Sequence, residues 1–379
     1  MTILTNARIV LADTVISGSL MIEAGRIAAI TQSTGTQGTG TQSIDLEGDF
    51  LTPGVIDLHT DNLERQVAPR ANARWPSRSA MLAHDAQCAV AGVTTVFDAL
   101  CLGDIGFEKE RVRTFEDGLA DLRALAGTGL LKAEHFLHLR CELPAPEMPE
   151  LLDRAIDDPL VRLVSIMDHS PGVGQYADID KYHRMRRAEG FSAAEIDEMV
   201  VTLQDNHAAY NRVNRELVLD LVRERQLPLA SHDDRTAEEV ALNHQDGIMI
   251  SEFPVSLAAA RAAKARGIRA IAGAPNIVRG GSHSGNVAAL DLIREGLVEA
   301  LASDYVPSSM MEAAFACAAS GATSLPEAIG LVSAGPAALA GLDDRGRIAT
   351  GLRADLVRVR VHEGMPVIRA VWRQGERVA

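Results

Sequence analysis

The sequence predicts an α/β fold, a (β/α)8 TIM-type barrel, with a small β-sandwich domain built from both chain termini. Strand and helix patterns alternate through the middle of the chain, which is typical of βα units around a parallel sheet. Short strand patterns recur at both ends. No Gly-X-Gly-X-X-Gly follows any candidate strand, which argues against the rival doubly wound sheet. We therefore expect a composite β domain over 1–51 plus 340–379 and a (β/α)8 barrel domain over 52–339.

Length and charge narrow the classes of function. A chain of 379 residues is longer than one small hydrophobic core can organise, so one large domain with a smaller module is expected. The composition, 47% hydrophobic and 23% charged, is that of an ordinary globular protein. The net charge of −14 argues against a general binder of nucleic acid or of anionic membranes. This net charge is still compatible with an anionic substrate that binds in a locally basic pocket.

The cysteines and the N-terminus predict a cytoplasmic location. Cys88, Cys101, Cys141 and Cys317 are far apart without paired spacing, which indicates reduced thiols. Residues 1–6 lack a basic region followed by an apolar core, so no signal peptide is expected. No apolar run is long enough for a membrane span.

The N-terminal and C-terminal segments have the same kind of sequence pattern. Alternating apolar runs over 3–10 and 18–30 predict short strands, and the Gly/Thr/Gln/Ser-rich segment 31–42 predicts a mobile loop. Similar strands are expected near the C-terminus, at 346–348, 355–359 and 366–372. We expect both ends to pair in one domain.

Eight candidate strands organise the middle of the chain, at 55–59, 94–99, 134–142, 162–168, 228–232, 247–252, 269–274 and 300–304. Eight is the strand number of a TIM-type barrel. The longest helical pattern starts at Ser192, where Ser192 and Glu195 form a capping box, and runs to Leu221 with apolar positions such as Tyr210 and Val213. Its length leaves open whether it is one helix or two.

The first barrel strand ends in a metal-binding pattern. Thr52-Pro53-Gly54 leads into an apolar run that ends in His59-Thr60-Asp61. Residues two apart on a strand face the same side, so His59 and Asp61 can bind one ion. The carboxyl ends of barrel strands are where catalytic groups lie. Alone the pair is a weak signal, because a surface His beside a surface Asp is common.

Five further strand ends offer side chains that bind metal. A single His there is usually structural and a single Asp is often a helix N-cap. Six strand ends that surround one pocket and all carry such residues are harder to explain by these structural roles. Imidazoles and carboxylates are suitable ligands for Zn²⁺, Mn²⁺ or Fe²⁺. These ends carry His59 and Asp61, then Glu142, Asp168 and His169, His232 with Asp233 and Asp234, Glu252, and Asp304.

Two carboxylates have distinct predicted roles. A carboxylate shared by two ions about 3.5–4 Å apart is typical of binuclear hydrolases, and Glu142 is the candidate bridge. A water bound to such ions has a pKa near 7 and needs a proton acceptor. Asp304, on the last strand, is the candidate.

These motifs resemble the amidohydrolase superfamily of metal-dependent (β/α)8 hydrolases. More narrowly, the chain resembles the α-D-ribose 1-methylphosphonate 5-triphosphate diphosphatases of the carbon–phosphorus lyase pathway. Asp61-Asn62 stands where the broader superfamily has its second His. The similar stretches cover nearly the whole chain, and include His59–Glu64, Leu82–Gln87, Gly92–Asp98, His138–Glu142, Met167–Gly172, Ser231–Asp234, Gly273–Asn276, Arg279–Asn286 and Leu301–Tyr305.

The resemblance implies metal ligands at His59, Asp61, Glu142, His169, His232 and Asp304. Two departures matter. The fourth strand has no Lys, so a carbamylated-lysine bridge is not expected and Glu142 must replace it. The sixth strand ends in Glu252 where many relatives have a His, which leaves open whether Glu252 or His169 is the ligand.

The segment after the seventh strand is the first choice for phosphate contacts. Glycines let the backbone approach an anion, and successive N–H groups can bind it; the residues are Arg279, Gly280, Gly281, Ser282, His283 and Ser284. An unliganded flexible loop is the alternative. Two further groups of basic residues could contact phosphate: the run Lys181–Arg187, and Arg65, Arg70, Arg74 and Arg78 in the segment after the metal-binding pattern. The matched motif adds Asn62 and Glu64 as substrate-binding candidates.

The resemblance implies hydrolysis of the α–β phosphoanhydride of a small ribose triphosphate with release of pyrophosphate. It implies a divalent metal cofactor, two ions with zinc first and manganese or iron as alternatives, and a homodimer. Two other functions stay open: a deaminase or cyclic amidase acting on a small heterocycle, and a non-catalytic scaffold built on a degenerate barrel.

Overall fold

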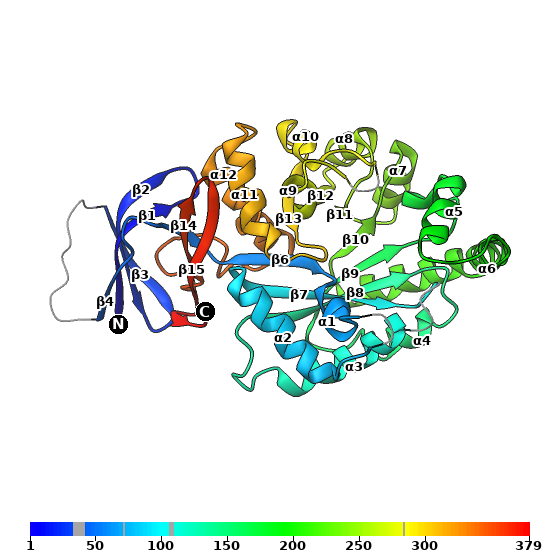
Figure 1. Ribbon diagram of the computed structural model, residues 1–379, viewed down its shortest axis with the longest axis horizontal. Helices are drawn as coiled ribbons and strands as arrows, with labels where there is room; N and C mark the ends of the chain where they lie inside the picture. The colour runs from blue at the N-terminus through cyan, green and yellow to red at the C-terminus, as the bar shows by residue number, and fades with distance from the viewer. Residues whose placement is uncertain (33–41, 71–72, 106–109, 283–284) are drawn as a thin grey trace.

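The computed structural model describes residues 1–32, 42–70, 73–105, 110–282 and 285–379. Two eight-stranded sheets organise them, one a parallel barrel and one a mixed sheet from both ends of the chain (Figure 1). The predicted loop at 31–42 lies almost entirely outside the described residues; residues 31 and 32 end a strand.

The barrel contains the eight strands that the sequence predicts. Neighbours pair in parallel, in chain order from β6 to β13. An isolated bridge between Thr60 and Asp304 joins the first strand to the segment after the last and nearly closes the ring. The strands are β6 (Val55–Thr60), β7 (Val93–Leu102), β8 (Glu134–Glu142), β9 (Val161–Met167), β10 (Leu229–His232), β11 (Ile250–Glu252), β12 (Arg269–Gly273) and β13 (Val298–Ala302).

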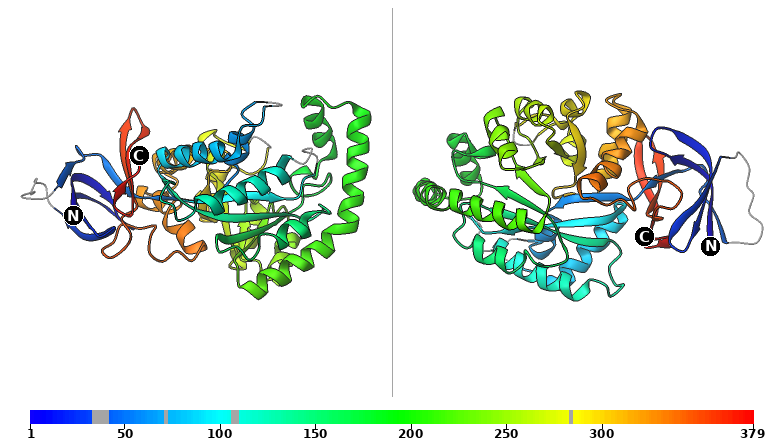
Figure 2. Two further views of the ribbon diagram at one scale, coloured as in Figure 1. Left: turned by 90° about the horizontal axis from the view of Figure 1, so that it is seen from below. Right: turned by 180° about the vertical axis from the view of Figure 1, so that it is seen from behind.

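Helices surround the barrel (Figures 1 and 2). Apolar side chains from its strands, such as Leu58, Phe97 and Ile271, pack together in one buried cluster. A filled interior leaves the strand ends as the place for a site. The helices are α1 (Asn62–Val67), α2 (Ser77–Val90), α3 (Glu110–Leu125), α4 (Met148–Asp153), α5 (Ile179–Ala188), α6 (Ala193–Arg225), α7 (Ala237–Gln245), α8 (Leu257–Ala265), α9 (Ala274–Val278), α10 (Ala289–Arg294), α11 (Ser309–Ala319), α12 (Leu325–Gly330) and α13 (Ala334–Leu339), with the 3₁₀ turn η1 (Gly174–Tyr176).

The segment after Ser192 is one helix. α6 runs for 33 residues, starts at the predicted capping box of Ser192 and Glu195, and ends where Gln226 adopts a left-handed backbone with φ of 54°. One stripe of α6 is buried. Tyr210 and Val213, predicted as apolar positions of the helix, are 39% and 56% exposed. A helix on the rim of the molecule buries one narrow face, so its other apolar residues stay in solvent.

Both chain ends share the second sheet, as predicted. β14 pairs antiparallel with β5, which joins the C-terminal strands to the N-terminal ones. The sheet contains β1 (Thr2–Val10), β2 (Val15–Glu23), β3 (Arg26–Gln32), β4 (Gln42–Asp45), β5 (Phe50–Pro53), β14 (Leu356–His362), β15 (Met365–Arg373) and β16 (Glu376–Arg377).

The strand predicted at 346–348 is wrong. Ile348 is buried in the core of this sheet, but the backbone around it bends. Gly346 has φ of 83°, and a Cβ there would lie 2.9 Å from the carbonyl oxygen of Ser333. The left-handed backbone at Gly346 turns the chain, so an extended run cannot form there.

Charged groups join the two parts of the molecule. Glu134, at the start of β8, accepts hydrogen bonds from Arg345 and from Arg353, the latter at 2.6 Å. Arg345 also donates to Thr95 Oγ1 on β7 at 3.0 Å. The C-terminal segment is thus anchored at the amino ends of barrel strands. Within the described ranges, none of the helices has the length and apolarity needed to span a bilayer.

Candidate active site

Three predicted metal ligands meet where the barrel closes. His59 is the last residue but one of β6, Asp61 directly follows the strand, and Asp304 follows β13. Asp304 donates its backbone N–H to the His59 carbonyl at 3.0 Å, which holds the two strand ends together. One ligand atom of each of the three residues lies within 4.8 Å of the others. His59 Nε2 and Asp61 Oδ1 are 3.7 Å apart.

A second group stands beside the first. Ligand atoms of His169, His232 and Asp233 also lie within 4.8 Å of one another. The rings of His59 and His232 stack at a centroid distance of 5.7 Å, so the two groups are neighbours. Asp233 was only part of a longer motif in the sequence, and its place beside His169 comes from the fold.

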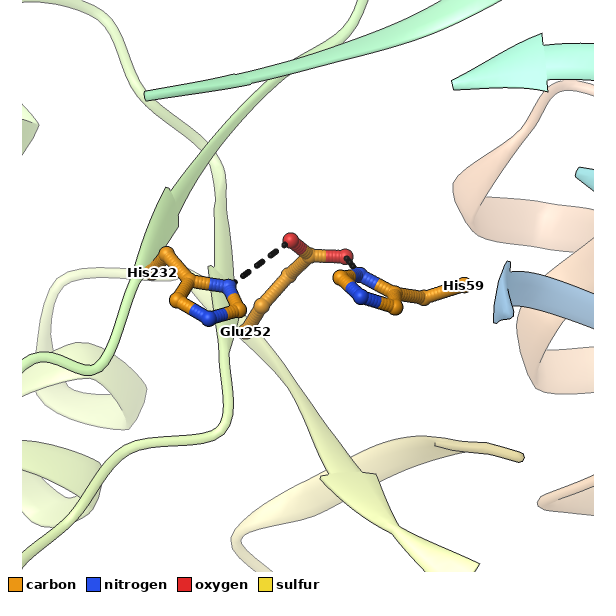
Figure 3. A group of neighbouring side chains, drawn as sticks. All are labelled: His59, His232 and Glu252. Carbon is orange, nitrogen blue, oxygen red and sulfur yellow. Dashed lines mark hydrogen bonds and ion pairs between the residues drawn. The ribbon is translucent and has the colours of Figure 1, made fainter. Parts of the chain in front are cut away.

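Glu252 orients two of these imidazoles. Its carboxylate lies between His59 and His232, 3.1 Å from Nδ1 of the first and 3.4 Å from Nδ1 of the second (Figure 3). Burial would raise the pKa of Glu252, but the facing histidines His138 and His59 hold it well below its ordinary value. A carboxylate that binds Nδ1 leaves Nε2 for a metal, which is the usual arrangement of ligating histidines.

Glu142 bonds a neighbouring ligand candidate. It is buried, and its two oxygens accept from His169, at 2.6 Å from Nδ1 and 2.9 Å from the backbone N–H. Burial raises the pKa of Glu142, but the charge and hydrogen bonds of His169 lower it overall. Glu142 belongs to none of the groups with converging ligand atoms among the described residues. Its role as a bridge stays a prediction.

The donor set fits a divalent cation. His59 Nε2 and Asp233 Oδ2 are buried and have no hydrogen-bond partner in the described part of the chain. Such atoms need a partner, and imidazole with carboxylate is the set that Zn²⁺, Mn²⁺ and Fe²⁺ take. Burial, followed by repulsion from Asp61, raises the pKa of Asp304 to about 6. A carboxyl group with that pKa can exchange protons near neutral pH.

A cavity of about 320 Å³ opens over these groups. Its acidic and imidazole side is formed by Asp61, His169, His232, Asp233 and Asp304. Four guanidinium groups also line it, from Arg111, Arg140, Arg186 and Arg279. One cavity therefore combines groups suited to cations with groups suited to anions.

Two of these arginines were not predicted. Arg140 on β8 is buried, and its Nη1 donates to both oxygens of Asp61 at 2.6 and 2.7 Å. Arg111 on α3 lies 3.4 Å from Glu64. Arg140 stands two residues before Glu142, so the alternation of the strand was a signal for it. Nothing in the local sequence points to Arg111.

The predicted substrate-binding residues fall into two sets. Arg279, Gly281 and Ser282 line the cavity, with Gly280 beside them. The others are placed elsewhere: Asn62 donates to His84 and Gln87, Glu64 faces Arg111, and Arg65 donates to the Tyr305 carbonyl at 3.1 Å. His283 and Ser284 lie outside the described residues. All of these roles stay predictions.

Comparison with known proteins identifies the lineage. No family model matches the chain. The chain is 42% identical, over 99% of its length and 100% of the relative, to the α-D-ribose 1-methylphosphonate 5-triphosphate diphosphatase of Escherichia coli. Two solved structures share its fold. An amidohydrolase has a TM-score of 0.59 and 16% identity, with 99% of this chain and 98% of that chain covered. The 5-methylcytosine deaminase of Klebsiella pneumoniae has a TM-score of 0.64 and 16% identity, with 100% and 97% covered.

The identity to the E. coli enzyme extends along essentially the whole chain, through both the barrel and the terminal sheet. The two solved structures, at 16% identity, show that the chain shares their fold. The chain belongs to the α-D-ribose 1-methylphosphonate 5-triphosphate diphosphatase family.

Proposed function

We propose that this enzyme hydrolyses the α–β phosphoanhydride of α-D-ribose 1-methylphosphonate 5-triphosphate in phosphonate catabolism. The products are the 5-phosphate and pyrophosphate. The observation that carries the proposal is the single cavity in which Asp61, His169, His232 and Asp304 face four arginines. The name of the 42% identical relative supports the same substrate.

The metal ligands of this proposal are His59, Asp61 and Asp304 in one group and His169, His232 and Asp233 in the other. Two groups suit two ions, with zinc first and manganese or iron as alternatives. When bound, such ions lower the pKa of water and offset phosphate charge. Glu252 keeps the Nε2 atoms of His59 and His232 available, because it occupies their Nδ1 atoms.

In the proposed reaction, a water oxygen forms a bond to the α-phosphorus and the bond from that phosphorus to the bridging oxygen breaks. Pyrophosphate leaves with the bridging oxygen and its electron pair. Asp304 accepts a proton from the water, a role supported by its position beside Asp61 in the lining of the cavity. The arginines bind the charge spread over the phosphate oxygens, since phosphoryl transfer depends mainly on positioning and electrostatics.

The cationic lining favours this function over a deaminase or cyclic amidase. A neutral heterocycle has no use for four guanidinium groups, which a triphosphate pairs with directly. The deaminase among the structural neighbours shares only 16% identity and thus shows the fold alone. The cytoplasmic setting is part of the proposal, supported by four cysteines that are all unpaired and buried.

The test incubates the metal-loaded protein with the triphosphate in ¹⁸O-labelled water. We expect pyrophosphate without label and 5-phosphate with one labelled oxygen, because the attack is at the α-phosphorus. Asp304→Asn should lower kcat at least about 100-fold, since proton transfer typically contributes 10²–10⁴-fold. Asp291→Asn, on the exposed side of α10, is the matched control. Release of orthophosphate, or turnover of a cyclic amide in its place, would contradict the proposal.

A further inference from the structure

The four arginines of the cavity come from opposite sides of the barrel. Arg140 is on β8, and Arg279 follows α9, directly after β12. In the ring from β6 to β13, β8 and β12 are four strands apart, which in eight strands is the opposite side. α3 and α9 accordingly lie across the barrel from each other (Figure 1). The candidate metal ligands stand between them.

Three guanidinium groups share one side, which we name the arginine wall: Arg111, Arg140 and Arg186. Arg186 lies over the ring of Tyr182 at 5.1 Å, and Tyr182 contacts Tyr176, whose ring is 6.0 Å from that of His169. Arg186 is thereby linked through two tyrosine rings to His169, with which it lines the same cavity. Arg140, bonded to Asp61, is placed next to the metal group that contains Asp61.

The arginine wall is preorganised by carboxylates. Arg140 is held by Asp61 and Arg111 by Glu64, and Arg186 donates to Glu189 at 2.9 Å. Fixed guanidinium forks lose little conformational entropy when they bind phosphate oxygens. In the described part of the chain, Nη1 carries both bonds of Arg140 to Asp61 and Nε is buried, which leaves Nη2 for a ligand.

Among the described residues that line the cavity, the opposite side offers one cation. This is Arg279, which is exposed and makes no ion pair within the described ranges. Gly281, Ser282 and Asn286 line the cavity beside it. We name this side the Arg279 side. Its single charge with small polar neighbours suits a group of lower charge than the arginine wall does.

The two anionic ends of the proposed substrate differ in the same way. The β and γ phosphates together carry about three negative charges near neutral pH, because the last proton of a phosphate has a pKa near 6. The methylphosphonate ester at C1 carries about one negative charge. We infer that the substrate spans the metal groups with its β and γ phosphates on the arginine wall and its C1 methylphosphonate toward Arg279.

This orientation rests on the proposed function and adds two specificity determinants to it. Arg186 binds the leaving pyrophosphate, and Arg279 recognises the C1 group that distinguishes this substrate from other ribose triphosphates. The α-phosphorus then lies beside Asp61 and Asp304, where the water attacks.

The experiment compares Arg186→Gln and Arg279→Gln in the metal-loaded full chain. Product inhibition by inorganic pyrophosphate should weaken about 10- to 100-fold in Arg186→Gln, the usual effect of losing a charged hydrogen bond, and stay unchanged in Arg279→Gln. Arg184→Gln and Arg294→Gln remove exposed arginines close in sequence to each site and serve as matched controls.

A second readout uses ribose 5-triphosphate without the methylphosphonate. The wild type should prefer the complete substrate in kcat/KM, and Arg279→Gln should lose this preference about 10-fold or more while Arg186→Gln keeps it. The reverse pattern, with pyrophosphate affinity dependent on Arg279, overturns the orientation and leaves the proposed function intact. A wild type that neither binds pyrophosphate nor releases it from the triphosphate overturns the proposed function itself.

Discussion

The carboxylate of Glu252 decides which nitrogens the site presents. It is fully buried and bonded to Nδ1 of both His59 and His232, so each ring has one possible orientation. His59 Nε2 remains buried without a partner among the described residues. A free Nε2 aimed at carboxylates is costly unless a cation binds there, and this makes Glu252 a positioning residue for metal binding.

Glu252→Gln tests that role. The amide replaces one carboxylate oxygen with an NH₂ group, which only donates, so one of the two imidazole N–H groups loses its acceptor. We expect metal affinity to fall about 10- to 100-fold, the usual effect of removing such a partner. Titration of the apoprotein with Zn²⁺ measures it, and Glu376→Gln, exposed on β16, is the control. Unchanged affinity in Glu252→Gln would show that the histidines need no orientation.

Backbone conformation at the strand ends also points to function. Three non-glycine residues just after barrel strands have positive φ angles. These are Asp233 after β10 (57°), Phe253 after β11 (53°) and Asp304, two residues after β13 (56°). Non-glycine residues in this region carry strain of about 1–3 kcal/mol. Two of the three are candidate metal ligands. The local turn aims their side chains over the barrel mouth.

At the scale of elements, a buried ionic network joins α2 to β7 and β8. Asp98 on β7 accepts from His84 Nε2 at 2.7 Å and from His135 Nδ1 at 2.8 Å, and His135 Nε2 lies 3.1 Å from Asp85. His84 also contacts Asn62, the residue after Asp61. The network thus holds α1, and the turn that carries Asp61, against the outer helices.

This network predicts a pH dependence of stability. Burial would lower the pKa of His135, but Asp98 and Asp85 raise it from 6.5 to about 9. A raised pKa stabilises the fold fully below pH 6.5, and that contribution is lost as the pH rises through about 9. The loss should be about 3 kcal/mol, by the energy of one pKa unit.

Urea unfolding of wild type and His135→Gln between pH 6.5 and 9.5 measures the difference. The wild type should lose more free energy of unfolding than the variant. If the variant does not fold, an NMR titration of the His135 imidazole in the wild type gives the pKa directly. A value near 6.5 would contradict this account.

At the scale of the whole molecule, the two sheets are joined by ion pairs at the amino ends of the barrel strands. Arg345 and Arg353 share Glu134, and Arg353 lies 3.0 Å from Asp355. Both arginine side chains are 6% exposed. The active-site strand ends are at the other end of the barrel, so one end serves stability and the other function.

Glu134→Ala should lower the free energy of unfolding by about 2 kcal/mol. Removing one partner leaves buried charges uncompensated, an effect of about 3–5 kcal/mol when the pair is fully buried, and solvent screening reduces it because Glu134 is 32% exposed. Urea unfolding at constant pH is the measurement, with Glu376→Ala as the surface control. Equal losses in both variants would mean that the ion pairs do not stabilise the junction.

The sequence by itself determined the barrel, the shared terminal sheet and most of the candidate ligands. These features depend on local periodicity, since strands repeat every two residues and helices every 3.6. The pattern that places His59 and Asp61 at the carboxyl end of β6, and Glu142 at the end of β8, is readable in the same way. The strand expected at 346–348 does not form, because Gly346 has a left-handed backbone and packs closely against Ser333, a contact that local periodicity does not report.

Only the tertiary structure decided how these groups meet. Glu252 between two histidines, Asp233 beside His169, and Arg111 with Arg140 and Arg186 in one wall join residues far apart in the chain. Such contacts depend on strand order around the ring and on helix packing, which are non-local. Sequence periodicity predicts the side of a strand or helix on which a side chain lies. The arrangement of the strands around the barrel determines which other side chains it contacts.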